Sequence, residues 1–143
     1  MSISQILKEK GDHVIAVKVD QSLSEAIKVM TNARIGAVLV NESSGAYCGI
    51  LSERDIMRAL EKSGGDAVNH DLREFMSANV HTVSLSTSID EAMQMMTGYR
   101  CRHLPVLEEG AIMGMVSIGD LVNFKINETA READALKEYI KTG

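Results

Sequence analysis

Two copies of one seven-residue pattern hold the side chains best suited to chemistry. Gly49–Asp55 reads GILSERD and Gly114–Asp120 reads GMVSIGD, so each copy runs glycine, two apolar residues, serine, two variable residues and aspartate. A serine followed three residues later by an aspartate caps the N-terminus of a helix, where the helix dipole also favours a carboxylate. The same pair can accept hydrogen bonds from ribose hydroxyls while the helix N–H groups bind a phosphate. For a single copy, capping is the simpler interpretation.

A second candidate group lies where four reactive or charged residues follow one another. Cys101 and His103 alternate with Arg100 and Arg102, and nearby arginines lower the pKa of a thiol. A cysteine nucleophile also needs an orienting group and an oxyanion site, and the sequence identifies neither. We therefore interpret Cys101, like Cys48, as a small buried side chain, and we expect no catalytic residue and no enzyme activity. The histidines lack the spacing of metal ligands, so we expect no metal site: His13, His70, His81 and His103.

The composition limits the classes of partner. The net charge is −5, with three Tyr, two Phe and no Trp, which disfavours a nucleic-acid-binding module with its basic and aromatic surface. No window approaches the roughly 18 apolar residues that span a bilayer, so we expect no membrane partner. Met1–Gly11 does not resemble a signal peptide. We expect a globular protein with reduced cysteines in the cytoplasm.

The two seven-residue patterns belong to a longer internal repeat. Ser22–Val40 aligns with Ser88–Val106 at an offset of 66 residues, and the offset falls to 65 where the seven-residue patterns align. Identical residues recur at matched positions, such as Glu25 with Glu91. Matching apolar pattern, charges and loops over so many positions indicates a duplication. Because each copy alone is small for a stable core, we expect the copies to pack face to face.

Each copy is predicted to fold as strand, helix, strand, strand, helix. In the first copy the predicted elements are strands at 14–19, 37–41 and 47–52, a helix from Ser22 and a helix from Glu53. In the second copy they are a strand at 80–85, a helix from Ser88, a hairpin over 103–117 and a helix from Ile118. The predicted organisation is an N-terminal helix (1–12), the first repeat (13–63), a linker (64–78), the second repeat (79–125) and a helical tail (126–143).

Three details within these elements make local predictions. Ser22 with Glu25, and Ser88 with Glu91, have the spacing of capping boxes. Pro105 inside a strand predicts an edge or an interrupted ladder. The tail carries a thin apolar stripe, which either lies on its own domain or contacts a second copy of the chain: Ile126, Ala130, Ala133, Leu136, Lys137 and Ile140.

The repeat resembles a pair of CBS domains (cystathionine β-synthase-type repeats), also called a Bateman module, over about Val14–Phe124. The resemblance rests on the S-x-x-E-A helix starts, on RIGAVLV with RCRHLPV, and on the two G-h-h-S-x-x-D motifs. Small stand-alone CBS-pair proteins of bacteria and plant organelles are particularly similar. The resemblance implies an α/β (α+β) fold in which two β-α-β-β-α repeats pack through their sheets about a pseudo-twofold axis. It also implies two clefts that hold adenosine derivatives, and a dimer of two such pairs.

The resemblance implies roles for the matched residues. Asp55 and Asp120 match the ribose-binding aspartates, and Ser52 and Ser117 match their hydroxyl partners. The segments before the first helix of each repeat match the lining of the adenine pocket: Ile15, Ala16 and Val17, and His81, Thr82 and Val83. The entries to the second strand match the phosphate-facing positions: Ile35, Gly36 and Ala37, and Cys101, Arg102 and His103.

The two copies differ at the phosphate-facing strand. Arg100, Arg102 and His103 bring positive charge where the first copy has only Arg34. A pseudo-twofold axis places the second copy's strand near Asp55, so we expect the cleft with Asp55 to bind phosphate more strongly.

Several side chains near this strand have alternative roles. Arg100 and Arg102 either bind phosphate or remain solvated or paired with Glu53 or Glu108. Arg54, with Gly119 at the matched position, either binds phosphate or pairs with a neighbouring acid. His103 is either a packed strand histidine or a phosphate contact.

The function that the sequence predicts is a non-catalytic sensor of an adenine nucleotide. The expected ligand is AMP first, then ADP, ATP, NAD(H) or S-adenosylmethionine, and no catalytic cofactor is expected. The expected partners are a second copy in a homodimer and an effector protein of unknown identity, reached in trans. The alternative is an assembly module that forms a dimer without a physiological ligand.

Overall fold

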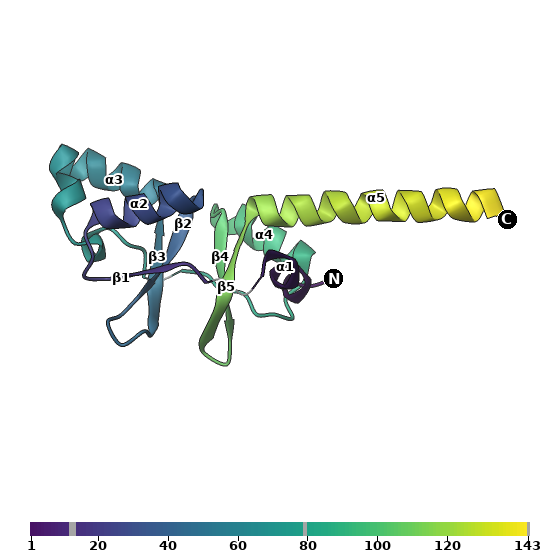
Figure 1. The fold of residues 1–143 in the computed structure, drawn as a ribbon, viewed down its shortest axis with the longest axis horizontal. Coiled ribbons are helices and arrows are strands. Elements are labelled where there is room, and N and C mark those ends of the chain that lie inside the picture. Colours follow the sequence, from purple (N-terminus) through teal and green to yellow (C-terminus); the bar gives the residue numbers. More distant parts are fainter. Residues whose placement is uncertain (12–13, 79, 143) are drawn as a thin grey trace.

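The structure, a computed structural model, describes residues 1–11, 14–78 and 80–142, and shows two similar halves with one long helix leaving the body (Figure 1). The first half contains a three-stranded sheet and the second a two-stranded sheet. Each half carries two main helices, in the order predicted for two tandem repeats. The fold is therefore the predicted α/β arrangement.

Elements of the first half follow the predicted order. Strand β1 (Ala16–Lys18) pairs in parallel with β2 (Ala37–Asn41), and β2 pairs antiparallel with β3 (Tyr47–Ser52). Helices α2 (Leu23–Ala33) and α3 (Glu53–Ser63) follow β1 and β3. Helix α2 buries residues at the three-and-four spacing of an amphipathic helix: Leu23, Ala26 and Met30.

The remaining elements include the predicted terminal helices. Helix α1 (Ile3–Lys10) begins the chain, and the segment predicted as a linker contains two short 3-10 helices, η1 (Gly64–Asn69) and η2 (Leu72–Glu74). The second half consists of α4 (Ile89–Tyr99), the hairpin of β4 (His103–Glu108) and β5 (Ala111–Ser117), and the 25-residue helix α5 (Ile118–Thr142).

The prediction of a strand at 80–85 is wrong. This segment makes a single isolated bridge, between Val83 and Val106. The Val83 N–H donates to the Pro105 carbonyl at 3.0 Å, and the Leu107 N–H donates to the Val83 carbonyl at 2.9 Å. In a parallel ladder the next bond would run from the N–H of residue 105 to the carbonyl of His81, and proline has no N–H. Pro105 therefore interrupts the ladder, as its place in the sequence predicted.

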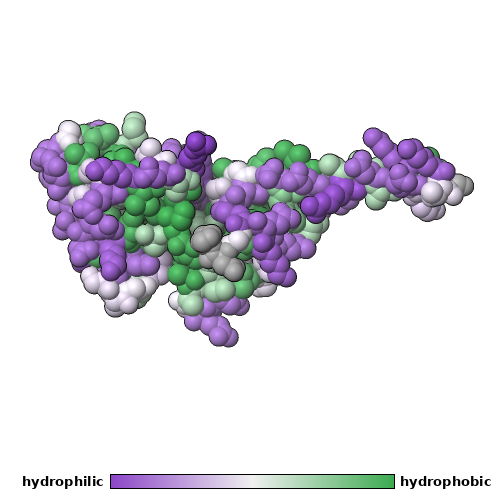
Figure 2. All heavy atoms as spheres, viewed as in Figure 1, coloured by the Kyte–Doolittle hydropathy of each residue, from purple (hydrophilic) through white to green (hydrophobic). Residues whose placement is uncertain are grey.

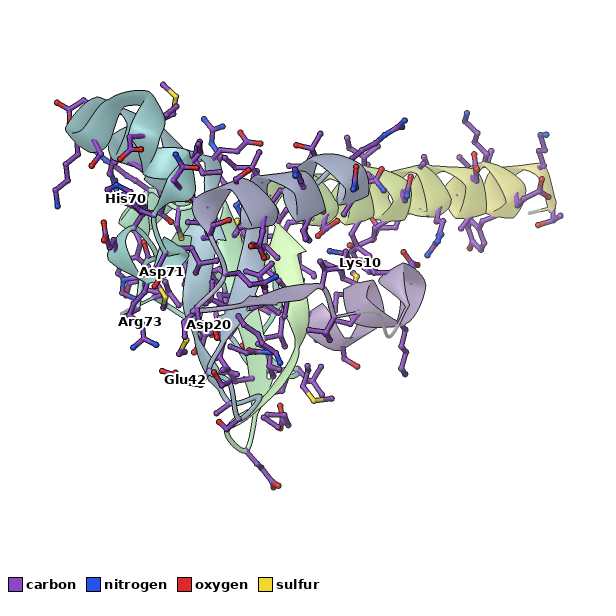
Figure 3. The ribbon with its side chains drawn as sticks, turned by 60° about the vertical axis from the view of Figure 1, so that its left-hand side comes forward. Lys10, Asp20, Glu42, His70, Asp71 and Arg73 are labelled. Atoms are coloured by element: carbon purple, nitrogen blue, oxygen red, sulfur yellow. The ribbon has the colours of Figure 1, made fainter. Side chains whose placement is uncertain are left out.

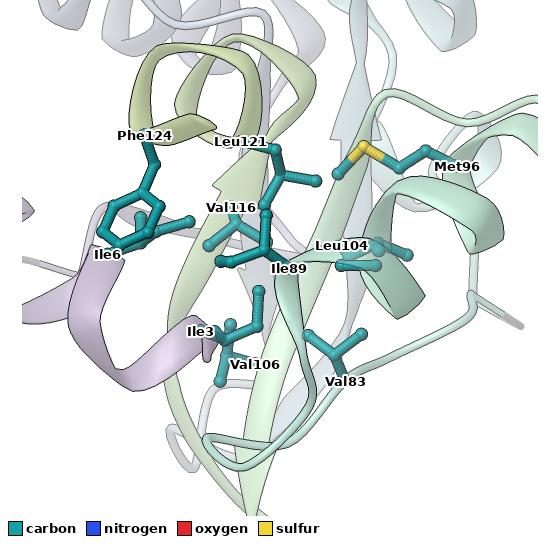
Figure 4. Packing of buried hydrophobic residues seen from close by; sticks show 11 residues of the cluster. Ile3, Ile6, Val83, Ile89, Met96, Leu104, Val106, Val116, Leu121 and Phe124 are labelled. Atoms are coloured by element: carbon teal, nitrogen blue, oxygen red, sulfur yellow. The ribbon is translucent and has the colours of Figure 1, made fainter. Parts of the chain in front are cut away.

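Each half has its own hydrophobic core. The first core is built from both helices and all three strands of the first half and from the segment that follows α3: Val17, Val19, Leu23, Ala26, Met30, Val38, Val40, Leu51, Ala59, Ala67 and Leu72. Figure 4 shows the second core, which is built from both helices and both strands of the second half and from α1: Ile3, Ile6, Val83, Ile89, Met96, Leu104, Val106, Val116, Leu121 and Phe124. Complete burial of one such aliphatic side chain stabilises the fold by about 1.5–3 kcal/mol.

The segment that precedes each repeat packs on the other repeat, which the sequence did not predict. Helix α1 precedes the first repeat, yet the Ile3 N–H donates to the Thr87 carbonyl (2.9 Å) and Ile3 lies in the second core. Leu72 precedes the second repeat, yet its N–H donates to the Gln21 carbonyl (3.0 Å) and its side chain lies in the first core. This exchange ties the two halves together, and we call α1 and the 64–78 segment the crossing segments.

The glycine that opens each seven-residue pattern is explained by this exchange. A Cβ on Gly49 would collide with the Ser77 carbonyl oxygen and with the Met76 side chain. A Cβ on Gly114 would come within 3.1 Å of Leu7. Each glycine thus lets the crossing segment lie directly against the strand that contains it, β3 for Gly49 and β5 for Gly114.

Candidate functional site

Both Ser-x-x-Asp motifs cap the helices that they begin. At the start of α3, the Asp55 N–H donates to Ser52 Oγ (3.3 Å) and the Ser52 N–H donates to Asp55 Oδ2 (2.9 Å). At the start of α5, the matching bonds between Ser117 and Asp120 measure 3.1 and 2.9 Å. The capping interpretation is therefore correct for both copies, and any ligand-binding role comes in addition to it.

The two Ser-x-x-Glu motifs form only half of the predicted capping box. Ser22 Oγ accepts from the Glu25 N–H (3.2 Å), and Ser88 Oγ accepts from the Glu91 N–H (3.0 Å). Among the described residues neither glutamate returns a bond to its serine, and the Glu25 carboxylate accepts from the Gln21 amide instead. The prediction of complete boxes at these two sites is wrong.

Asp55 lies at the base of a cleft of about 650 Å³ between the two repeats, within the usual size of a small-molecule site. Residues of the first repeat, of the crossing segment and of the second repeat line this cleft: Gly36, Ile50, Ser52, Glu53, Arg54, Asp55, Arg58, Ser77, Val80, His81, Tyr99, Arg100, Cys101, Arg102 and His103. The predicted pairing of the Asp55 side with the second copy's 100–103 strand entry is thus present in the geometry. We call it the Asp55 cleft.

The Asp55 carboxylate is held rigidly at the helix N-terminus. Its side chain is 4% exposed, and Ser77 Oγ donates to Asp55 Oδ1 at 3.0 Å. Ser52 Oγ lies 3.1 Å from Oδ2, and an Arg58 Nη1 lies 3.6 Å from Oδ1. Ser77, from the crossing segment, was not identified in the sequence, because only the exchange of segments brings it to Asp55.

Four arginines line the Asp55 cleft: Arg54, Arg58, Arg100 and Arg102. Arg54 Nη1 donates to the Arg100 carbonyl at 2.7 Å, so this side chain bridges the two repeats rather than pairing with an acid. In the described part of the chain, neither Arg100 nor Arg102 makes an ion pair; Glu108 instead accepts from the Leu85 N–H. The positive charge along this cleft is therefore available to an anion.

An aromatic pair forms one wall of the cleft. The rings of His81 and Tyr99 stack with centroids 3.4 Å apart and planes 8° from parallel. Tyr99 lies on the same helix face as the buried Ala92 and Met96, yet 53% of it is exposed. It is the last residue of α4, one residue before Arg100, where this face meets the cleft instead of the core.

Burial controls the two titratable side chains at the start of β4. Burial lowers the pKa of His103, and the charges of Glu53 and Asp120 oppose this effect only in part, so a neutral imidazole is favoured. Burial likewise raises the pKa of the Cys101 thiol, against the lowering expected from nearby arginines. Cys101 and Cys48 are both half-buried free thiols, and each packs against the core of its own half.

The second Ser-x-x-Asp motif has a different environment. Lys10 lies at the end of α1 (Figure 3). Its ammonium group donates to Asp120 Oδ2 at 2.8 Å and to the Met115 carbonyl at 3.0 Å. Neither Ser117 nor Asp120 lines the Asp55 cleft. Lys10 was not identified in the sequence, since it lies outside the repeat. The carboxylate that matches Asp55 in the second repeat is therefore paired with a lysine of the same chain.

The other predicted site residues are not brought together. Val17, Ala37 and Val83 are buried in the hydrophobic interior, while Ile15 is exposed. Ile35 lines a shallower depression of about 400 Å³ between α2 and α3, which Gly36 also borders. Ala16 and Thr82 line neither hollow. Of the predicted set, the Asp55 cleft collects Gly36, Ser52, Arg54, Asp55, His81, Arg100, Arg102 and His103.

Two further findings concern metals and membranes. Among residues 1–11, 14–78 and 80–142, no group of three or more His, Cys, Asp or Glu side chains could hold a metal ion. His13 lies outside the described residues. No helix within the same ranges is long and apolar enough to cross a bilayer.

Comparisons with known proteins agree with this architecture. The CBS domain family matches residues 4–62 and 72–127. The CBS domain-containing protein CBSX3, mitochondrial, of Arabidopsis thaliana is 33% identical over 150 residues, covering 99% of this chain and 73% of that protein.

Two solved structures share the fold. The CBS-domain containing protein ATU1752 from Agrobacterium tumefaciens has a TM-score of 0.82 at 35% identity, covering 85% of this chain and 91% of that one. The CBS domain pair of protein MJ0100, solved with 5′-methylthioadenosine and S-adenosyl-L-methionine, has a TM-score of 0.79 at 22% identity, covering 90% and 98%.

Proposed function

The chain belongs to the CBS-domain family, and from that premise we propose that it is a non-catalytic sensor that binds one adenine nucleotide in the Asp55 cleft. The observation that carries the proposal is the composition of this cleft. A buried carboxylate at a helix N-terminus, a stacked aromatic pair and four arginines converge on one hollow between the repeats. These groups suit a ribose, a base and a phosphate, respectively.

The charge of the cleft favours a phosphorylated ligand. Two acidic side chains line the cleft, Glu53 and Asp55, against the four arginines. AMP, ADP, ATP and NAD(H) all carry negative charge, whereas S-adenosylmethionine carries a sulfonium cation that arginines repel. The MJ0100 pair, which has the same fold, was solved with two adenosine derivatives, and this supports an adenosine moiety in the ligand. We place AMP first among the nucleotides, with the remaining phosphorylated compounds as alternatives.

Ligand binding at this position acts on the arrangement of the two repeats. The cleft is lined from both repeats, and Arg54 bridges them through the Arg100 carbonyl. A nucleotide that contacts Asp55 and the 100–102 segment at once stabilises one relative orientation over others. An effector protein that prefers this orientation then responds to the nucleotide concentration. The proposal places the protein in the cytoplasm, where its thiols stay reduced.

Calorimetric titration of nucleotide-stripped protein tests the proposal. Adenosine, AMP, ADP, ATP, NAD, NADH and S-adenosylmethionine are titrated into the wild type and into Arg102→Met. We expect micromolar binding of a phosphorylated compound, and a larger loss in Arg102→Met for that compound than for adenosine. If no compound gives heat or a thermal shift, the sensor is rejected, and the motifs act as helix caps in an assembly module.

A further inference from the structure

Helix α5 extends far beyond the body that it starts from. Its last buried residue is Phe124, and every described residue from 129 to 142 is exposed. Figure 2 shows this helix projecting clear of both halves, with hydrophilic and hydrophobic residues along the face in view. Of the two alternatives for the tail, the one in which its apolar stripe lies on its own domain is therefore wrong.

Large apolar side chains on this projection are exposed to water. Ile126 is 61% exposed, Leu136 is 60% exposed and Ile140 is 68% exposed. An isolated helix as short as the projecting 129–142 segment is marginal in water, because its own hydrogen bonds barely offset the conformational entropy. A second surface that covers these side chains would stabilise both the helix and the apolar groups.

Four of the five large apolar residues that α5 exposes follow the heptad spacing of a coiled coil, and Tyr139 does not. Residues 122, 126, 129, 133, 136 and 140 are separated by alternating steps of four and three, and we call them the α5 seam: Val122, Ile126, Thr129, Ala133, Leu136 and Ile140. This register refines the stripe read from the sequence, since Ala130 and Lys137 flank the seam. Ile126 and Ile140 take two of the three a positions and Leu136 takes one of the three d positions, the residue types that favour two strands. Ala133 takes the third a position, and Val122 and Thr129 take the other two d positions.

Contacts with the body leave the seam open to a partner. Leu121 and Phe124 are buried, Lys125 Nζ lies 3.0 Å from Asp90 Oδ1, and Arg131 Nη2 lies 3.8 Å from Glu9 Oε1. At about 100° of rotation per residue, these positions centre roughly 120° around the helix axis from the seam. A second helix can approach the seam without displacing α1 or α4.

We infer that α5 pairs with α5 of a second copy of this chain as a parallel, in-register coiled coil. In that arrangement Glu132, at a g position, faces Lys137 of the partner at the following e position, an attractive pair that occurs twice by symmetry. An antiparallel arrangement that pairs the same six layers sets Glu132 against its own copy, which is repulsive. Charge complementarity therefore selects a second copy as the occupant and parallel as the direction.

Sedimentation equilibrium of three full-length proteins tests the seam. Leu136→Glu places a charge in the seam. Ala135→Glu adds the same charge one residue away, on the helix face that Leu121 and Phe124 share, outside the seam. We expect a dimer for the wild type and for Ala135→Glu. The dissociation constant of the Leu136→Glu dimer should be at least about tenfold higher than that of the wild type, because one buried leucine per helix is lost. A monomeric wild type, or an unchanged dimer in Leu136→Glu, would overturn the inference.

Disulfide trapping tests the direction of the helices. In a parallel pair Ile140 faces Ile140, so Ile140→Cys should form a covalent dimer under mild oxidation. In the antiparallel pair Ile140 faces Val122 and no such dimer forms. The wild type, with its half-buried Cys48 and Cys101, gives the background. A dimer that Ile140→Cys fails to trap above this background rejects the parallel arrangement. Nucleotide affinity of Leu136→Glu should stay unchanged, which separates this result from the proposed function.

Discussion

The two Ser-x-x-Asp motifs of this protein belong to one repeated pattern, yet among the residues around them only the helix caps are alike. Ser52 with Asp55 and Ser117 with Asp120 make the same reciprocal bonds within 0.2 Å. Around these caps the residues that can recognise a ligand differ at matched positions: Arg54 with Gly119, Tyr99 with Ala33, His81 with Ile15, Arg102 with Gly36, and His103 with Ala37. The cations and the aromatic pair thus come from one member of each matched pair and line the Asp55 cleft, while the other member is small or apolar.

The crossing segments increase the difference. The segment before the second repeat gives the Asp55 cleft Ser77, a neutral hydroxyl that orients the carboxylate. Helix α1 gives the second motif Lys10, whose ammonium group pairs with Asp120, the carboxylate that a ribose would need there. A duplicated motif is therefore evidence of a duplicated fold, while ligand binding depends on residues that the motif does not contain.

The largest expected effect separates the two aspartates. Asp55→Asn should weaken nucleotide binding by about 10–100-fold, because hydrogen bonds to a charged acceptor contribute about 1.5–3 kcal/mol. Asp120→Asn, the matched change at the other cap, should leave the affinity as it is. Asparagine still caps a helix, so both variants stay folded. Calorimetry measures both, and equal losses would mean that the clefts are equivalent.

A smaller effect is expected at the two arginines that end helices α4 and α2. Arg100 and Arg34 are matched, since both are exposed and both have a left-handed backbone, with φ of 54° and 57°. Arg100→Met should weaken ATP binding by about tenfold and adenosine binding little, because a charge-assisted hydrogen bond to phosphate is lost. Arg34→Met should change neither. Equal weakening by the two variants would place phosphate in both clefts.

Removal of Lys10 should affect stability rather than binding. Lys10→Met breaks a partly exposed ion pair, so the free energy of unfolding should fall by about 0.5–1 kcal/mol. Lys8→Met, an exposed lysine on the same helix, serves as the control. Thermal unfolding and nucleotide titration of each variant test this prediction. A nucleotide affinity lowered only in Lys10→Met would assign Lys10 to the ligand and contradict the difference between the clefts.

The smallest effect concerns pH and the segment that delivers Ser77. His70 (Figure 3) lies 3.0 Å from both Glu74 Oε2 and Asp66 Oδ2, and these two hydrogen bonds raise its pKa above the ordinary 6.5. The stabilisation is complete below pH 6.5 and is lost as the pH rises through the raised value. The melting temperature of the wild type should exceed that of His70→Gln at pH 6, and the gap should narrow by pH 9. A gap that widens would show that the neutral imidazole is preferred.

Local sequence patterns were sufficient to predict the repeat and the order of its elements apart from the strand at 80–85, whereas the position of the Asp55 cleft came from the resemblance to CBS pairs. Ser52 and Asp55 lie at a helix start that their own spacing defines, and Pro105 interrupts the ladder as its missing N–H requires. Lys10 and Ser77 were missed, since each reaches its aspartate only through the exchange of crossing segments. Long-range contacts of this kind depend on the tertiary fold, which no local pattern records.

The stoichiometry of nucleotide binding tests the central claim most directly. Saturating calorimetry or native mass spectrometry should find one nucleotide per chain, and Asp55→Asn should remove it while Asp120→Asn retains it. Two nucleotides per chain, or a single one that survives Asp55→Asn and disappears in Asp120→Asn, would contradict the assignment of ligand binding to the Asp55 cleft.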